Sequence, residues 1–131
     1  MKRKPITARN RILLIFDELS PPVSLLLVLA AQGYEVTLAR NGEEVQNELV
    51  TDSKPDLVVL ELQLNAIDLL QLIQSVQPHI PVIVTAEASL LNLALMIKEE
   101  FGAWEVLPKP LDFTLLGQLL QLVMQKPAFI S

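Results

Sequence analysis

Five polar residues stand at the ends of short apolar runs in this sequence, and they are the side chains best placed to do chemistry. They are Asp17, Glu18, Glu61, Thr85 and Lys109. Together they would supply three carboxylates, one hydroxyl group and one ammonium group. A polar residue at a single strand end is ordinary, but five at one edge of a sheet would indicate a functional pocket of acidic character.

The apolar runs before these residues have the length and composition of β-strands. They are Arg11–Phe16, Leu57–Leu60, Ile80–Val84 and Val106–Leu107, the last with Trp104 nearby. Runs that are apolar on both faces are typical of parallel strands in a sheet covered by helices on both sides. Tyr34–Ala39 differs because apolar and polar residues alternate along it. This alternation predicts an edge strand with one face partly open.

The segments between the strands have helical length and carry start and stop signals. The expected helices are Pro21–Gly33, Glu43–Val50, Asn65–Val76, Ser89–Phe101 and Leu111–Gln125. Ser20 and Asn41 are suitable N-caps for the first two. Gly33 and Gly102 can end a helix in the left-handed conformation, and Pro127 stops the last one.

Strict alternation of five strands and five helices predicts an α/β domain with a doubly wound parallel sheet. Five strands favour the order 2-1-3-4-5, in which the functional crevice lies at the carboxyl ends of the first and third strands. All five polar residues would then meet at that edge.

The totals suit one domain, because 51% of the 131 residues are hydrophobic and 19% are charged. The absence of cysteine excludes disulfides, thiolate nucleophiles and cysteine-based metal sites, and it fits a reducing, cytoplasmic location. A net charge of -5 argues against nucleic acid as the partner. Leu25–Ala31, the most apolar early stretch, is far below the ~18 residues of a membrane span, so no membrane partner is expected.

Residues 11–126 are expected to form the domain, with short tails at residues 1–10 and 127–131. The first tail is basic, with Lys2, Arg3, Lys4 and Arg9. Such a run fits either a solvated tail or an anion-binding arm. The sequence after the last expected helix is short, which predicts a stand-alone module.

Three segments resemble the receiver domains of bacterial response regulators, and the resemblance spans about residues 11–126. The segments are Pro55–Asp68, Pro81–Ala86 and Gly102–Pro110. They are similar to the third strand with its following loop, to the fourth strand and to the fifth strand. The resemblance implies a flavodoxin-like receiver fold, and a cis bond between Lys109 and Pro110.

The resemblance also assigns roles to the polar edge, and the sequence departs from several of them. Thr85 stands at the switch position and Lys109 at the phosphate-pairing position, but Glu61 replaces the phosphorylated Asp. Phe16 and Asp17 stand where the family has two adjacent acids that hold Mg²⁺. The other departures are Val106 for an aromatic residue and Asn65–Ala66 for Pro-Gly.

These departures predict no cofactor, with weak Mg²⁺ binding as the most that the site could support. Mg²⁺ requires near-octahedral oxygen ligands at roughly 2.0–2.1 Å. Phe16 removes one carboxylate and Glu61 displaces another by a methylene group, while Glu18 could compensate in part. Phosphoryl transfer depends on the metal and on exact positioning, so no phosphorylation of Glu61 is expected.

Two roles for Glu61 stay open. Its carboxylate could imitate the phosphorylated state by reaching toward Lys109 and Thr85, although it carries one charge rather than about two. Alternatively, it forms a plain ion pair with Lys109 that closes the pocket. Neither role involves turnover, so the chain is not expected to be an enzyme.

The expected fourth and fifth helices carry more apolar residues than one buried face can hold. The candidates for an interaction face are Leu90, Leu93, Leu95, Ile97 and Trp104, although packing is the simplest role for Trp104. Either the core is unusually deep or an exposed apolar patch marks a partner surface. In receiver domains, the fourth helix, fifth strand and fifth helix form the usual dimer contact. The first helix is a second candidate.

Three functions follow from these observations. The first is a degenerate receiver that binds a signalling or kinase-like protein, or a second copy of itself, without phosphorylation. The second is a phosphorylatable receiver with a non-standard acidic site. The third, a small hydrolase, is disfavoured because no base or nucleophile is evident and the single histidine, His79, lies in a remote loop.

Overall fold

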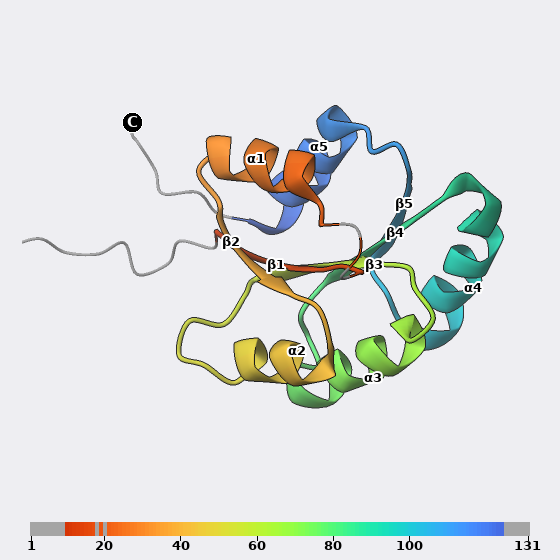
Figure 1. Ribbon diagram of the computed structural model, residues 1–131, viewed down its shortest axis with the longest axis horizontal. Coiled ribbons are helices and arrows are strands. Elements are labelled where there is room, and N and C mark those ends of the chain that lie inside the picture. The colour runs from red at the N-terminus through yellow and green to blue at the C-terminus, as the bar shows by residue number, and fades with distance from the viewer. Residues whose placement is uncertain (1–9, 18, 20, 125–131) are drawn as a thin grey trace, which may run out of the picture.

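The computed structural model describes residues 10–17, 19 and 21–124. Five strands and five α-helices alternate along this part of the chain (Figure 1). The strands are β1 (Arg11–Ile15), β2 (Glu35–Ala39), β3 (Leu57–Glu61), β4 (Val82–Ala86) and β5 (Glu105–Pro108). The helices are α1 (Val23–Ala31), α2 (Gly42–Leu49), α3 (Ala66–Val76), α4 (Leu91–Phe101) and α5 (Phe113–Val123), with a 3-10 turn at Ala88–Leu90 before α4.

All five strands are parallel and their order is β2-β1-β3-β4-β5, which confirms the expected doubly wound sheet. β2 lies at the edge, as the alternation of its residues predicts. Leu38 at this edge is exposed, whereas Ala39 is buried. The buried face of β2 therefore shifts by one residue at its carboxyl end.

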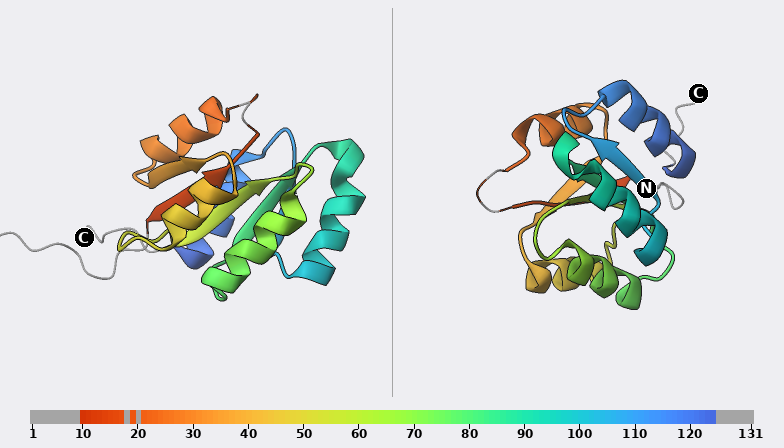
Figure 2. Two further views of the ribbon diagram at one scale, coloured as in Figure 1. Left: turned by 60° about the horizontal axis from the view of Figure 1, so that its bottom comes forward. Right: turned by 90° about the vertical axis from the view of Figure 1, so that its right-hand side faces the viewer.

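Helices cover both faces of the sheet and create two core layers. Figure 1 shows α1 and α5 on one face, and Figure 2 shows α2, α3 and α4 side by side on the other. Alternate residues of β1 enter opposite layers: Leu13 packs under α2 and α3, and Leu14 packs under α1 and α5. This division explains why the central strands are apolar on both faces.

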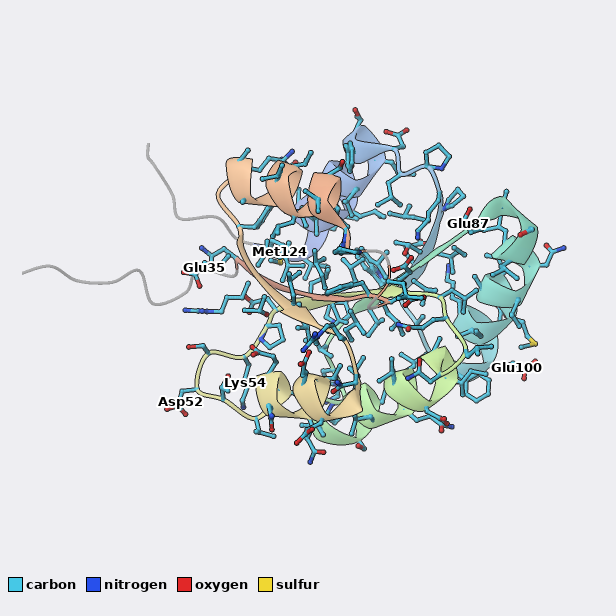
Figure 3. All side chains as sticks on the ribbon, in the orientation of Figure 1. Glu35, Asp52, Lys54, Glu87, Glu100 and Met124 are labelled. Atoms are coloured by element: carbon cyan, nitrogen blue, oxygen red, sulfur yellow. The ribbon has the colours of Figure 1, made fainter. Side chains whose placement is uncertain are left out.

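The outside of the domain carries its charges, while the apolar side chains fill the two layers. Glu35, Asp52 and Lys54 lie at the periphery in Figure 3 and are exposed. Met124, at the end of α5, is buried in the layer beneath α1 and α5. Within the described ranges, no helix combines the length and the apolar character needed to cross a membrane.

The helix signals in the sequence are mostly correct, with shifted starting points. The Asn41 side chain accepts a hydrogen bond from the Glu44 amide, as an N-cap should, and Gly33 and Gly102 have φ of 93° and 86°. The last helix begins at Phe113 rather than Leu111, because Asp112 is its N-cap. The first begins after Pro21–Pro22, at Val23.

Some of the sequence predictions concern residues outside the described ranges. They are the cap at Ser20, the acid Glu18, the stop at Pro127, the basic tail and the C-terminal tail.

Candidate functional site

Three of the predicted site residues meet where the carboxyl ends of the central strands converge. Glu61 is the last residue of β3 and pairs in register with Thr85 of β4. Lys109 follows β5, and its backbone amide donates to the Ala86 carbonyl at 2.8 Å. This bond fixes the start of the Lys109 side chain beside β4. The Lys109–Pro110 peptide is cis, as the resemblance implies.

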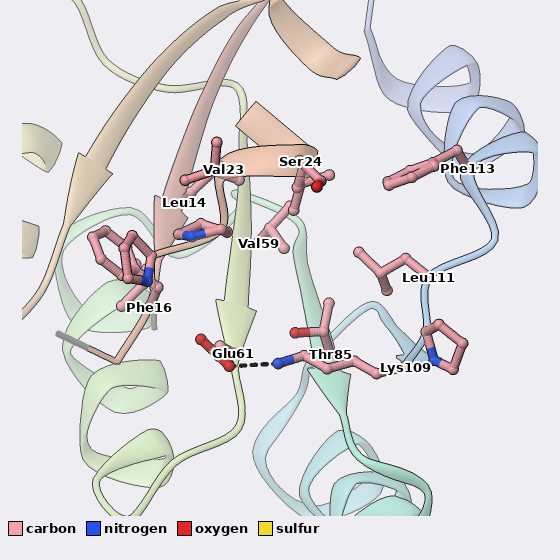
Figure 4. Close-up of a pocket in the computed structure, with 15 residues that line it drawn as sticks. Leu14, Phe16, Val23, Ser24, Val59, Glu61, Thr85, Lys109, Leu111 and Phe113 are labelled. Carbon is pink, nitrogen blue, oxygen red and sulfur yellow. Dashed lines mark hydrogen bonds and ion pairs between the residues drawn. The ribbon is translucent and has the colours of Figure 1, made fainter. Parts of the chain in front are cut away.

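The Glu61 carboxylate is held by two partners. One oxygen, Oε2, forms an ion pair with Lys109 Nζ, drawn as the dashed line in Figure 4. The other, Oε1, accepts a hydrogen bond from the Asp17 amide at 3.3 Å. The two paired side chains are only 19% and 28% exposed, so solvent screens them less than an ordinary surface pair.

Asp17 reaches the site mainly through its backbone. Its Oδ1 accepts a hydrogen bond from the Leu19 amide at 3.0 Å, which turns one oxygen of the side chain toward its own loop. Glu18, the third predicted acid, lies outside the described residues. Among residues 10–17, 19 and 21–124, no group of three or more His, Cys, Asp or Glu could hold a metal ion.

The Thr85 side chain lies beside this ion pair without joining it (Figure 4). Thr85 is 3% exposed and is the only polar residue buried in the described part of the chain. Its hydroxyl makes no hydrogen bond within that part of the chain. Thr85 lines a cavity, so its hydroxyl is open to a solvent molecule or a ligand there.

An apolar cavity of about 310 Å³ opens above these residues. Phe16, Leu111 and Phe113 contribute to its wall, and Glu61, Thr85 and Lys109 form its polar part. The contribution of Leu111 and Phe113 is not predicted from the sequence. The available signal is that the segment after Pro110 is apolar, where an exposed loop would be polar.

A second cavity of about 420 Å³ lies on the opposite side of Glu61, between the β3–α3 loop and α4. Asp17, Gln63, Leu90 and Leu93 are among the residues that line it. The Gln63 side-chain nitrogen is buried and has no hydrogen-bond partner in the described structure. Glu61 therefore stands between two hollows.

The fold, the polar edge and the Lys–Pro segment all match one family. The model of the response regulator receiver domain matches residues 12–121. The chain belongs to this family. Receiver domains are signalling modules of two-component systems that contact partner proteins and often dimerise.

Individual relatives of this receiver domain are similar over most of the chain. The DNA-binding transcriptional regulator NtrC of a Bradyrhizobium strain is 34% identical over 116 residues, covering 83% of this chain and 24% of the regulator. The regulatory protein AtoC of Escherichia coli is 30% identical over 124 residues, covering 92% of this chain and 26% of AtoC. The chain thus spans about a quarter of the length of these curated relatives.

Solved receiver domains superpose along nearly the whole domain. A receiver domain protein from Clostridium thermocellum has a TM-score of 0.76 at 25% identity and covers 87% of this chain and 93% of its own. The non-phosphorylated HemR receiver domain of Leptospira biflexa has a TM-score of 0.70 at 29% identity, with coverages of 92% and 99%.

The predicted interaction face of this receiver domain needs correction. Leu90, Leu93 and Leu95 are 40–43% exposed, but Ile97 is only 2% exposed and belongs to the core beneath α4. Ile97 therefore cannot belong to an exposed face, because it points at the sheet. Trp104 is half-buried and packs against the core layer beneath α1 and α5.

Proposed function

We propose that this receiver domain works as a phosphorylation-independent binding module, with its acidic site replaced by the Glu61–Lys109 ion pair. The contact between Glu61 Oε2 and Lys109 Nζ is the observation that carries the proposal. It occupies an oxygen of the residue at the phosphoacceptor position. In the described structure the Glu61 oxygens bond to Lys109 and to the Asp17 amide and not to the Thr85 hydroxyl, which supports a plain ion pair over imitation of the phosphorylated state.

The donor set at this edge does not fit Mg²⁺. One Glu61 oxygen faces an ammonium group, the other accepts the Asp17 amide, and one Asp17 oxygen accepts the Leu19 amide. Phe16 is buried and supplies no oxygen where the family has an acid. Since Mg²⁺ tolerates little error in its ligands, we expect these residues to bind poorly the ion on which phosphoryl transfer depends.

The binding surface that we assign includes an apolar stripe on α5. Leu115, Leu119 and Leu122 follow at spacings of four and three residues and so share one side of the helix. Leu115 is 40% and Leu122 is 76% exposed. Gly117 and Gln121 face the turn between α1 and β2, so the leucine stripe lies on the other flank.

On α4 only part of the exposed apolar surface belongs with this stripe. Lys98 pairs with Glu105 of β5 at 3.3 Å, and this contact identifies the flank of α4 that faces β5. At about 100° per residue, Leu95 lies near this flank, whereas Leu93 is about 200° away from Leu95. Leu93 instead lines the cavity beside the β3–α3 loop.

The proposed partner is a second copy of this chain, through α4, β5 and α5. The leucine stripe and Leu95 supply an apolar centre, and the Lys98–Glu105 pair supplies a charged rim. A two-fold contact would bring each stripe against its own copy, which an apolar stripe tolerates. The net charge of -5 disfavours nucleic acid as the partner.

Two experiments test the two halves of this proposal. Intact mass measured after incubation with acetyl phosphate and Mg²⁺ should stay unchanged, while a receiver domain that retains the acceptor Asp gains one phosphoryl group. Such a gain in this chain would support the second candidate, a phosphorylatable receiver with a non-standard acid.

The dimer is tested by sedimentation velocity over a range of protein concentrations. Leu122→Glu should dissociate the dimer, whereas Leu27→Glu should not. The control is matched because Leu27 is also a helical leucine, 63% exposed, but lies on α1. A wild-type chain that stays monomeric, or a dimer equally sensitive to both substitutions, would overturn the assigned surface.

A further inference from the structure

The cavity above the ion pair is shaped like a small-molecule site. Its volume of about 310 Å³ lies at the lower end of the range of roughly 300–1,000 Å³ that ligand pockets span. Figure 4 shows Phe16 on one side and Leu111 and Phe113 on the other, with the polar residues at the base. An apolar wall with a few convergent polar groups is the usual composition of such a site.

The base of the cavity offers hydrogen-bond donors that the protein does not use. Thr85 lines this cavity, and its hydroxyl makes no hydrogen bond to another described residue. Lys109 carries three N–H donors, and its side chain makes one contact with a described residue, Glu61. A ligand atom that accepts hydrogen bonds would satisfy both groups at once.

The charge at the base selects the kind of acceptor. Glu61 and Lys109 are the two charged residues that line the base, and they form an ion pair whose charges offset each other. An anionic ligand would be repelled by the Glu61 carboxylate. A cationic ligand would be repelled by the Lys109 ammonium group and would offer no acceptor to its N–H donors. The base therefore suits an uncharged carbonyl or amide oxygen.

We infer that this cavity binds a small uncharged molecule with an apolar body and a single carbonyl or amide head. The body packs between Phe16 and Phe113, and the head accepts hydrogen bonds from Thr85 and Lys109. Phe16 contributes an apolar side chain to the cavity wall, where a metal-binding acid would contribute a polar one. The cavity lining includes none of the leucines of the proposed dimer surface, so the inference does not depend on dimerisation.

The test uses three probes with one body and different heads: phenylbutyramide, phenylbutyrate and phenylbutylamine. Each is titrated into the full chain and followed by amide and methyl NMR. Phenylbutyramide should give saturable shifts at Leu25, Leu111 and Phe113 with none at Ile73, which lies in the other core layer. Phenylbutyrate should bind more weakly, and phenylbutylamine weakest.

Three variants complete the test. Leu111→Trp fills the cavity and should abolish binding, while Leu27→Trp, the same change at an exposed position on α1 outside the cavity lining, should leave it intact. Thr85→Val removes the hydroxyl at constant shape and should weaken binding roughly two- to tenfold.

Each contrary outcome overturns the assignment. The site is refuted if no saturable shifts occur at the cavity, if Leu111→Trp binds phenylbutyramide as the wild type does, or if the amine binds as tightly as the amide. Loss of binding in Leu27→Trp as well would show that the effect of Leu111→Trp is not specific to the cavity. Because Leu122→Glu tests the dimer separately, failure of either proposal leaves the other intact.

Discussion

The ion pair between Glu61 and Lys109 should make a measurable contribution to stability, and its size tests whether the site is closed. The perturbation is a double-mutant cycle made from Glu61→Gln, Lys109→Met and the double variant. Glu61→Gln keeps the shape and still offers an oxygen to the Asp17 amide. Lys109→Met keeps the aliphatic stem but removes the charge.

The expected coupling follows from how far the pair is buried. Exposed pairs contribute about 0.2–1 kcal/mol, and removing one partner of a fully buried pair costs about 3–5 kcal/mol. Glu61 and Lys109 are 19% and 28% exposed and so lie between these limits. We therefore expect a coupling energy of about 1–2 kcal/mol.

The cycle is measured by urea unfolding at constant pH and ionic strength. The chain contains its own control, since Lys98 and Glu105 form a second pair at 3.3 Å with side chains that are 34% and 39% exposed. The corresponding cycle of Lys98→Met and Glu105→Gln should give less than about 1 kcal/mol. Added salt should weaken the control pair more than the Glu61 pair.

A coupling energy near zero for Glu61 and Lys109, or one no larger than that of the control pair, would refute the reasoning. Glu61 would then be free to meet solvent, a cation or a phosphodonor. In that case the charged edge would be an open acidic site rather than a closed one.

Three further predictions concern the fold. Burial raises the pKa of the Tyr34 phenol above its ordinary value near 10.0. The unfolded chain therefore loses this proton first, and the free energy of unfolding should fall as pH rises above about 10. Urea titrations should show a smaller fall for Tyr34→Phe, and an equal fall would contradict this cause. Asp112→Ala removes a cap that accepts two backbone N–H bonds at the start of α5 and should lower the free energy of unfolding by about 1 kcal/mol, whereas no change would show that the cap contributes nothing. Leu70→Ala should lower the free energy of unfolding by about 2–5 kcal/mol, because Leu70 is 0% exposed. Leu122→Ala, at a 76% exposed position, should change it by no more than about 0.5 kcal/mol. Similar losses at both positions would contradict the assigned burial.

The strand order and the meeting of Glu61, Thr85 and Lys109 could be predicted from the sequence. Apolar runs locate the central strands, and parallel strands with right-handed crossovers bring their carboxyl ends to one edge. The residue that follows each run is then placed without any knowledge of side-chain packing. The start of α5 is predicted less accurately, because it depends on a side-chain cap at Asp112.

The interaction face could be predicted only in part. Helical periodicity shows that Leu93, Leu95 and Ile97 cannot all face the sheet. It does not show which side of the helix does. That direction is set by the sheet beneath α4, which buries Ile97 and leaves Leu93 and Leu95 on opposite flanks. The cavity could not be predicted from the sequence, because its wall combines Phe16 with residues nearly a hundred positions away.

The replacements at the carboxyl edge are consistent with one another. Phe16 stands in place of a metal-binding acid, and the carboxylate of the neighbouring strand, Glu61, has Lys109 as its counter-ion. Glu61 has one methylene more than the usual acceptor, which lets its carboxylate reach Lys109 while Oε1 keeps the Asp17 amide. A neutral pair beside an apolar ring costs less than isolated charges there.

This arrangement changes what could regulate the domain. A ligand shifts a conformational equilibrium only by the difference in its affinity for the two states. On the proposed function, Glu61 at the phosphoacceptor position is paired and is not phosphorylated, and Val106 stands in place of the aromatic residue. The unpaired Thr85 hydroxyl still links the cavity to β4, whose next segment leads into α4. A molecule that engages Thr85 is therefore the input that this edge retains toward the α4–β5–α5 surface.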